Sequence, residues 1–263
     1  MRRLCVDGRG ELLRVEPIGP DEVLVKVLAA NICGTDLRIY HGGHRHYPPG
    51  SVRIPGHEVT GTIAALGERV QGFSIGQRVF VAPNMGHGTS RATVSGNNNM
   101  DPDFLAIGIN LDGAFAEYMR VPALALQQGN LMPMDEAVDP SVAALIEPLA
   151  CVLRGQNAVN VHSGDVVVIM GAGPIGILHM KLAAVRGAAR VIVSEPSAAR
   201  RAQALELGAD QVVDPVNEDL AAAVRAASSG RGADVVIVAA PSKVAQEAAL
   251  EIAAIGGRIN LFG

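Results

Sequence analysis

The sequence predicts an α/β protein in which a mainly β domain is followed by a doubly wound parallel sheet. In the second half of the chain, strand-like apolar runs alternate with helix-like segments, which is typical of parallel sheets with right-handed crossovers. The first of these runs, residues 165–170, breaks into glycines at Gly171, Gly173 and Gly176 and then resumes as a helix-like segment. In the first half, short strand-like runs lie between glycines and prolines, which favours a compact, barrel-like β domain.

The length and composition fit a globular protein of two domains. The 263 residues can form two cores, and we expect domains at residues 1–155 and 156–263. A formal net charge of −4 gives no electrostatic attraction to nucleic acid or acidic membranes. Cys5, Cys33 and Cys151 are far apart and odd in number, which favours a reducing cytoplasm over a disulfide framework. The first residues lack the apolar core of a secretion signal, so we expect a cytoplasmic protein.

The first domain is expected to contain a series of short strands. They are residues 11–15, 22–28, 59–66, 77–81 and 115–121. Residues 85–100 form a long loop without periodicity, and such loops in compact domains are usually functional or mobile. A helical run over residues 141–153 leads to the second domain, where the expected elements follow in alternation. The strands are 166–170, 190–194, 211–214, 234–239 and 258–262, and the helices are 177–185, 198–207, 219–227 and 243–254.

The glycine motif and a later glutamate predict a dinucleotide site. Gly171 permits a tight turn, Gly173 lets the backbone approach a pyrophosphate, and Gly176 lets the helix pack on the strand. Glu195 ends the next strand, where a carboxylate would accept hydrogen bonds from the adenosine ribose of NAD. Arg200, with Arg201 beside it, leaves NADP as the alternative cofactor. The alternative to a dinucleotide site is a glycine-rich strand-to-helix turn in an α/β protein. The expected cofactor-binding residues are Gly171, Gly173, Pro174, Ile175, Gly176, Glu195 and Arg200.

A second group of side chains, in the first domain, suits a metal ion. Cys33, His57 and Glu58 offer a thiol, an imidazole and a carboxylate, while Glu147 lies in an apolar run. A carboxylate is costly to bury there unless a cation compensates it. Such ligands suit Zn²⁺ in a catalytic arrangement that leaves one position to water or substrate. Because no short paired-ligand motif is present, the sequence also allows interpretations without a metal. In these, Cys33 is a buried structural residue, His57 lies in a loop, and Glu147 caps a helix or forms a salt bridge near Pro148.

Together, these motifs resemble the medium-chain zinc-dependent alcohol dehydrogenase family over essentially the whole chain. The glutamate at position 147 is most similar to the polyol (sorbitol-type) and threonine dehydrogenase branch. The resemblance implies a GroES-like catalytic domain followed by a Rossmann domain. The residues that carry it are Cys33-Gly-Thr-Asp36, Gly56-His-Glu58, Gly76-Gln-Arg-Val79, Glu147-Pro148, and Gly171 to Gly176 with Glu195.

The resemblance also implies roles for individual residues. Asp36 would orient His57, and the hydroxyl of Thr35 would take the substrate proton. With NAD as hydride acceptor, the reaction is the oxidation of a secondary alcohol, such as a polyol or sugar alcohol, to the ketone. A zinc-free reductase of the same superfamily and a non-catalytic NAD-binding relic are the rival functions. The implied zinc ligands are Cys33, His57 and Glu147, with Glu58 as a nearby alternate.

The chain departs from the family pattern at several places. Arg38 stands where many relatives have a proton-relaying histidine, and we expect it to pair with a cofactor phosphate or a carboxylate. The last strand or strands of the second domain, which usually build a homodimer or homotetramer interface, are expected to be missing, so that residues 258–262 form an unpaired apolar edge. The lobe at residues 87–101 is expected to hold no structural zinc, because the usual four cysteines are replaced by His87, Ser90, Thr93 and Asp101.

Histidines cluster in residues 40–47. His41, His44 and His46 show no paired-ligand pattern, which favours a solvated turn over a substrate-facing loop. Because Arg45 lies beside them, the sequence also allows an anionic substrate, such as a polyol phosphate. The expected partner is a small alcohol or ketone, with neither nucleic acid nor a membrane involved.

Overall fold

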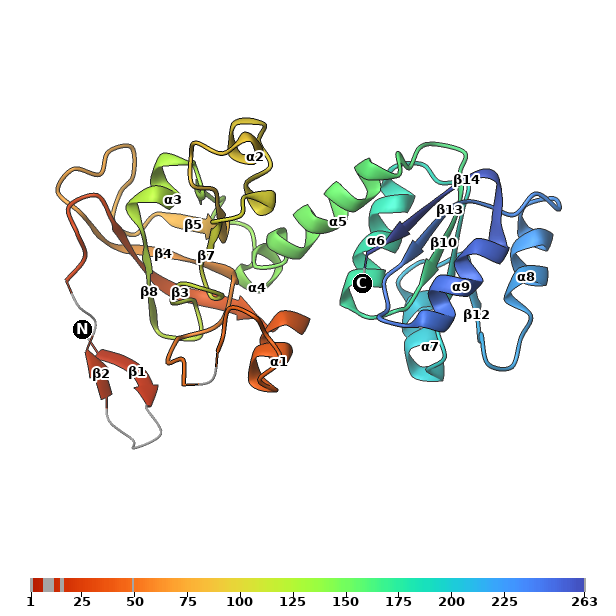
Figure 1. Ribbon diagram of the computed structural model, residues 1–263, viewed down its shortest axis with the longest axis horizontal. Helices are drawn as coiled ribbons and strands as arrows, with labels where there is room; N and C mark the ends of the chain where they lie inside the picture. Colours follow the sequence, from red (N-terminus) through yellow and green to blue (C-terminus); the bar gives the residue numbers. More distant parts are fainter. Residues whose placement is uncertain (1, 7–11, 15–16, 49, 263) are drawn as a thin grey trace. The chain divides into compact units, whose positions relative to one another are not determined.

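A computed structural model describes residues 2–6, 12–14, 17–48 and 50–262. The chain forms two compact units, Met1–Glu147 and Pro148–Gly263 (Figure 1). The first unit is mainly β and the second is α/β, which confirms the predicted fold class. The predicted junction after residue 155 falls inside helix α5 (Ile146–Ala158), close to where the units divide, and we retain it as a proposal.

The first unit is built on a five-stranded antiparallel sheet in the order β8-β3-β4-β5-β9. Alternate side chains of these strands, such as Val23, Val25 and Ile63, are almost completely buried and form its core. Two further strand pairs, β1 with β2 and β6 with β7, lie outside this sheet. The strands are β1 (Arg2–Val6), β2 (Leu12–Arg14), β3 (Val23–Asn31), β4 (Glu58–Leu66), β5 (Arg78–Val81), β6 (Asn84–Met85), β7 (Leu105–Ala106), β8 (Tyr118–Val121) and β9 (Leu131–Pro133).

Short helices complete the first unit. Helix α1 follows β3 directly, and the remaining helices lie in the connections after β6, β8 and β9 (Figure 1). No strand was predicted for β6, β7 or β9, because these segments are too short to show alternation. The helical elements are α1 (Gly34–Tyr40), α2 (Arg91–Val94), the 3₁₀ turn η1 (Asn98–Met100), α3 (Ala123–Gln127) and α4 (Pro140–Ala143).

The second unit is a five-stranded parallel sheet in the order β12-β11-β10-β13-β14. Its central strand β10 is buried at all five positions, as expected for a strand covered on both faces. The strand order reverses beside β10, and this topological switch point is where doubly wound folds bind ligands. The elements are β10 (Val166–Met170), α6 (Pro174–Val185), β11 (Arg190–Ser194), α7 (Ala198–Glu206), β12 (Gln211–Val213), α8 (Leu220–Ala227), β13 (Ala233–Val238), α9 (Lys243–Ile252) and β14 (Ala253–Leu261).

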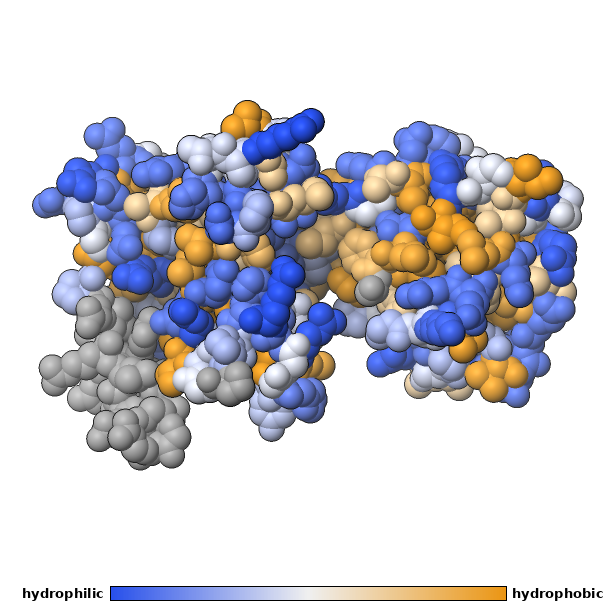
Figure 2. Space-filling view, in the orientation of Figure 1, coloured by the Kyte–Doolittle hydropathy of each residue, from blue (hydrophilic) through white to orange (hydrophobic). Residues whose placement is uncertain are grey.

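Strand β14 begins earlier than the sequence suggested. The predicted helix ran to residue 254, but α9 ends at Ile252 and β14 starts at Ala253. Gly256 has a φ of +78°, and the register against β13 shifts there, so a glycine bulge lets the strand begin early. Among the described residues, β14 pairs with β13 alone, and Figure 2 shows apolar surface along it. Ile255 and Leu261 are exposed there, as expected for an apolar edge.

The lobe between β6 and β7 is organised around one buried carboxylate. Oδ2 of Asp101 accepts hydrogen bonds from Ser90 Oγ and Thr93 Oγ1, both at 2.6 Å, and from the backbone N–H of His87 at 3.0 Å. These bonds hold the pKa of Asp101 well below its usual range. The four positions that lack the family's cysteines are thus joined by hydrogen bonds. That the lobe takes no structural zinc stays a prediction.

Helix α6 carries a histidine in the core of the second unit. His179 is fully buried, and its backbone oxygen accepts from Gln156 Nε2 at 2.8 Å. The rings of His179 and Phe262 meet edge to face, with centroids 4.5 Å apart. Nε2 of His179 has no hydrogen-bond partner among the described residues. Burial lowers the pKa of His179 to about 4, so the imidazole is neutral in the folded protein near pH 7.

Among the described residues, no helix combines the length and the apolar character that a membrane crossing requires.

Changing Asp101 to Asn should loosen the lobe without removing zinc from the protein. The amide nitrogen cannot accept hydrogen bonds, so donors at Ser90 and Thr93 lose a partner. We expect the melting temperature to fall by a few degrees and the zinc content to stay the same. Asp103→Asn, an exposed carboxylate changed in the same way two residues further on, is the matched control. Loss of one zinc ion per chain in Asp101→Asn would show that the lobe binds metal.

The second unit should lose stability on mild acidification because of His179. The unfolded histidine takes up its proton near pH 6.5, whereas the folded one does so only near pH 4, so the free energy of unfolding falls as pH drops through this interval. This histidine should contribute a loss of about 2 kcal/mol between pH 7.5 and pH 5. Denaturant unfolding of His179→Met, which cannot titrate, should show a smaller pH dependence. Equal slopes in the two proteins would contradict the assignment.

Candidate active site

The first part of the site lies between the end of β3 and the start of α1. Cys33 is the N-cap residue of α1, with extended backbone angles, and its N–H donates to Asp36 Oδ2 at 2.9 Å. The other oxygen of Asp36 accepts from the N–H of Gly56 at 3.3 Å. Asp36 is only 6% exposed. One buried carboxylate therefore ties the loop that carries Cys33 to the loop that carries His57.

The second loop has a backbone that only glycine can adopt comfortably. Gly56 has a φ of +96°, and a Cβ there would lie 2.7 Å from the ring of Phe115 and 2.9 Å from its backbone nitrogen. His57 follows at once, and Glu58 is the first residue of β4. Both side chains are buried, at 4% and 5% exposure. The tight turn at Gly56 thus directs two polar side chains inward.

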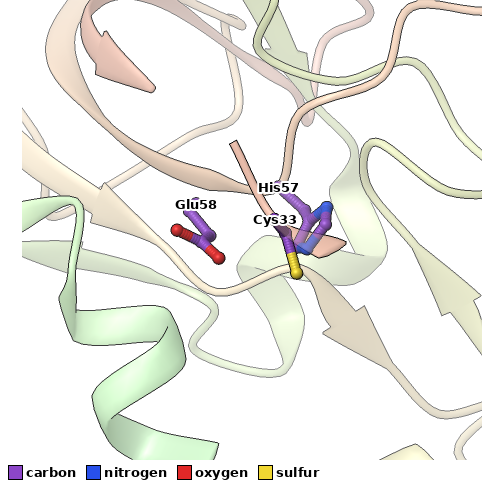
Figure 3. Close-up of side chains that lie close together, drawn as sticks. All are labelled: Cys33, His57 and Glu58. Atoms are coloured by element: carbon purple, nitrogen blue, oxygen red, sulfur yellow. The ribbon is translucent and has the colours of Figure 1, made fainter. Parts of the chain in front are cut away.

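Cys33, His57 and Glu58 converge on one point (Figure 3). One ligand atom from each residue lies within 4.8 Å of the corresponding atoms of the other two. The sequence separates the cysteine from the other two by more than twenty residues, and the antiparallel pairing of β3 with β4 brings them together, with Asn31 opposite Glu58. A thiol, an imidazole and a carboxylate in this arrangement form a possible zinc ligand set.

Burial shifts all three groups of this cluster towards their neutral forms. It raises the pKa of the Cys33 thiol, and the charges of Glu58 and Glu147 raise it further, although hydrogen bonds from Thr35 oppose the shift. Burial also raises the pKa of Glu58 and lowers that of His57. A divalent cation would reverse this balance, because it favours the thiolate and the carboxylate.

The imidazole of His57 faces the carboxylate of Asp36. Its Nδ1 lies 3.6 Å from Asp36 Oδ1, and this buried nitrogen has no hydrogen-bond partner within the described part of the chain. A carboxylate at this place is the usual partner of a metal-binding histidine, because it fixes the ring orientation and the tautomer. The unpartnered Nδ1 of His57, together with the thiol, imidazole and carboxylate of the cluster, fits a bound metal ion.

The other predicted site residues in this unit lie close to the cluster. Glu147 is in the first turn of α5 and near enough for its charge to raise the pKa of the Cys33 thiol, but it is not one of the three converging residues. Thr35 interacts with the Cys33 thiol through both its backbone N–H and its hydroxyl. The structure thus groups Glu58, rather than Glu147, with Cys33 and His57. Which glutamate binds zinc stays a proposal.

The glycine motif of the second unit has the geometry expected of a phosphate loop. Gly171 has a φ of +107°, and a Cβ at Gly176 would lie 1.9 Å from the Gly171 carbonyl oxygen. In contrast, a Cβ at Gly173 would have no described atom within 4 Å. Gly173 is the N-cap of α6, and Pro174 and Ile175 form its first turn, so the N-terminal N–H groups of the helix are available to an anion.

Glu195 is a fixed part of this loop. Its Oε2 accepts from the N–H of Ala172 at 2.8 Å, its Oε1 accepts from the N–H of Ser197 at 2.9 Å, and the residue is 4% exposed. Glu195 also lines a pocket of about 560 Å³ with Gly171 and Arg200 at the end of the parallel strands. The guanidinium of Arg201 already has partners within the protein. It donates a hydrogen bond to the backbone oxygen of Glu195 and forms an ion pair with Asp214 at 2.9 Å.

Sequence reasoning missed part of both sites. The rest of the pocket comes from segments without a motif, including Val216, Ala240 and Ile252. No signal in the sequence identifies these residues, because their proximity depends on how α8 and α9 pack on the sheet. Phe115, which forces glycine at position 56, was predicted only as part of a strand. That contact also required the tertiary structure.

Comparison with known proteins supports the same two sites. The alcohol dehydrogenase GroES-like domain family matches residues 19–136, and the zinc-binding dehydrogenase family matches residues 174–263. An L-threonine 3-dehydrogenase of Caldanaerobacter subterraneus subsp. tengcongensis is 36% identical over 258 residues, which cover 95% of this chain and 70% of that protein. A sorbitol dehydrogenase of Bacillus subtilis is 33% identical over 256 residues, 96% of this chain and 71% of the relative.

A solved structure agrees in fold. A protein of Sinorhizobium meliloti 1021, assigned as a zinc-binding dehydrogenase and bound to NADP, superimposes with a TM-score of 0.88 at 34% identity, covering 96% of this chain and 72% of that one. Both units therefore have counterparts in dehydrogenases. The chain belongs to the medium-chain zinc-dependent alcohol dehydrogenase family, in the branch that contains polyol and threonine dehydrogenases.

Proposed function

We propose that this protein transfers hydride between a secondary alcohol, a polyol or sugar alcohol, and NAD. The observation that carries the proposal is the convergence of Cys33, His57 and Glu58 in the first unit of a chain whose second unit has a complete phosphate loop. The names of the relatives, a threonine and a sorbitol dehydrogenase, agree with an alcohol substrate. A zinc ion bound to this cluster would supply Lewis-acid activation of the alcohol oxygen.

The residues around the cluster would hold the ion and handle the proton. Cys33 and His57 are proposed ligands, with Glu147 or Glu58 as the third, and Asp36 keeps the His57 ring in place. Thr35 would accept the proton of the substrate hydroxyl and pass it on, since its own hydroxyl lies beside the Cys33 thiol.

The cofactor is proposed to be NAD rather than NADP. Glu195 lines the pocket with its carboxylate held in place by two backbone N–H groups, and a 2′-phosphate would be repelled there. Arg200 lines the same pocket and is the residue that could offset this repulsion. A dimer or tetramer and a cytoplasmic location are the family-based expectations for the protein.

Replacing Cys33 by Ser should remove zinc and activity together. Serine is a poor zinc ligand, so we expect zinc content to fall from about one ion per chain and turnover to fall at least about a hundredfold. Zinc analysis and NAD reduction with a panel of polyols measure both. Cys151→Ser makes the same chemical change at an exposed position outside the cluster and should alter neither. Full activity in Cys33→Ser would refute the zinc site, and zinc-free activity in the parent protein would favour the reductase.

Two alanine substitutions in the phosphate loop should affect different properties, one the NAD affinity and the other the stability. Gly173→Ala meets open space and a favourable backbone, so the fold should survive while the methyl group weakens NAD binding about tenfold or more. Gly176→Ala collides with the Gly171 carbonyl and should instead lower the melting temperature strongly. Thermal unfolding and NAD titration distinguish the two effects. Unchanged NAD affinity in stable Gly173→Ala would place the pyrophosphate elsewhere.

A further inference from the structure

The segment that links the two parts of the metal cluster is rich in potential positive charge. Residues 37–57 contain no aspartate or glutamate, but they contain three arginines and four of the seven histidines of the chain. The segment starts in the helix capped by Cys33 and ends at His57. In a chain with a formal net charge of −4, this concentration of cationic side chains beside the cluster stands out from the rest of the sequence.

The structure gathers these side chains around His44. The rings of His44 and His46 lie 5.6 Å apart, and Arg45 Nε donates to His46 Nε2 at 3.1 Å. The stem of Arg38 lies against the same turn, since a Cβ at Gly43 would be 3.6 Å from Arg38 Cγ. Burial lowers the pKa of His44, and nearby positive charge on His46, Arg38, Arg45 and His57 lowers it further. These effects favour the neutral form of His44, so the positive charge of the turn comes from Arg38 and Arg45, and Arg38 belongs to the helix capped by Cys33.

The cations of this turn are not neutralised by the protein. Arg69, Arg201 and Arg258 each form an ion pair with an aspartate. Over the ranges that the structure describes, neither Arg38 nor Arg45 is paired with a carboxylate in this way. The sequence-based expectation was that Arg38 pairs with a cofactor phosphate or a carboxylate, and among the described residues no carboxylate forms such a pair with it. An external anion would find two guanidinium groups available, and the guanidinium fork fits carboxylates and phosphates equally well.

We propose, on the basis of the proposed function, that the alcohol substrate carries an anionic group, a carboxylate or a phosphate ester. Arg38 and Arg45 bind this group beside the turn at His44, while the hydroxyl to be oxidised reaches the cluster of Cys33, His57 and Glu58. A neutral polyol makes no use of these guanidinium groups. The site thus selects aldonates or polyol phosphates over uncharged sugar alcohols.

The test compares three substrates of similar length with the zinc-loaded enzyme: sorbitol, gluconate and sorbitol 6-phosphate. We expect kcat/KM to be at least about tenfold higher for one of the anionic substrates, and the better of the two identifies the anion. The double variant Arg38→Gln, Arg45→Gln should lose this preference through a higher KM for the anionic substrates. Arg91→Gln, an exposed arginine of the same unit outside the segment, is the matched control. Sorbitol as the best substrate, or an equal loss for all three, would overturn the proposal.

A binding measurement keeps this inference separate from the proposed function. Calorimetric titration of the zinc-loaded protein with gluconate and with sorbitol 6-phosphate needs no turnover. The Kd of the preferred anion should rise at least about tenfold in the double variant and stay constant in Arg91→Gln. Equal Kd values in parent and double variant refute anion binding at the turn. If no alcohol reduces NAD but the Kd difference is found, the proposed oxidation fails and the anion site stands.

Discussion

The candidate site depends on the burial of one carboxylate, that of Asp36. Removing a carboxylate from water is costly unless hydrogen bonds and charge compensate it. Here the compensation comes from hydrogen bonds donated by the N–H of Cys33 and the N–H of Gly56, and the imidazole of His57 lies 3.6 Å away. Each of these groups belongs to a residue of the cluster or to its immediate neighbour. The bonds that make Asp36 tolerable in the interior therefore also fix the spacing between the thiol and the imidazole, before any metal binds.

The same burial explains why the cluster suits a cation. The buried thiol of Cys33 and the buried carboxyl of Glu58 both have raised pKa values, and the charge of Glu147 adds to the effect on the thiol. These residues place several potential negative charges in a small volume of low polarity. A divalent ion would stabilise their deprotonated forms, so metal binding and proton release are coupled. Without a cation, these side chains carry little charge because they are buried, and not because their residue types are uncharged.

The sequence predicted most of the second unit and only part of the site. The bounds of β10 and β11 were predicted to the residue, because buried parallel strands give unbroken apolar runs that end at glycine or a polar residue. The start of β14 was wrong, since Gly256 permits a bulge that no periodicity reveals. The choice between Glu58 and Glu147 could not be predicted, because both are carboxylates beside apolar residues and only the pairing of β3 with β4 places one of them next to Cys33.

Each unit contains a buried acidic side chain that accepts hydrogen bonds from the backbone of its own site. In the first, Asp36 binds backbone N–H groups on either side of the zinc-type cluster; in the second, Glu195 binds the N–H of Ala172 inside the phosphate loop and that of Ser197 after β11. In both cases an acidic side chain that is expected to serve the chemistry also orders the backbone around it. The entropy of fixing these loops is lost when the protein folds, so it does not have to be lost again when cofactor or substrate binds. Substituting either acid would consequently disturb the loop together with its ligand. Cofactor binding and anion binding are therefore tested more cleanly at Gly173 and at Arg38 and Arg45 than at either acid.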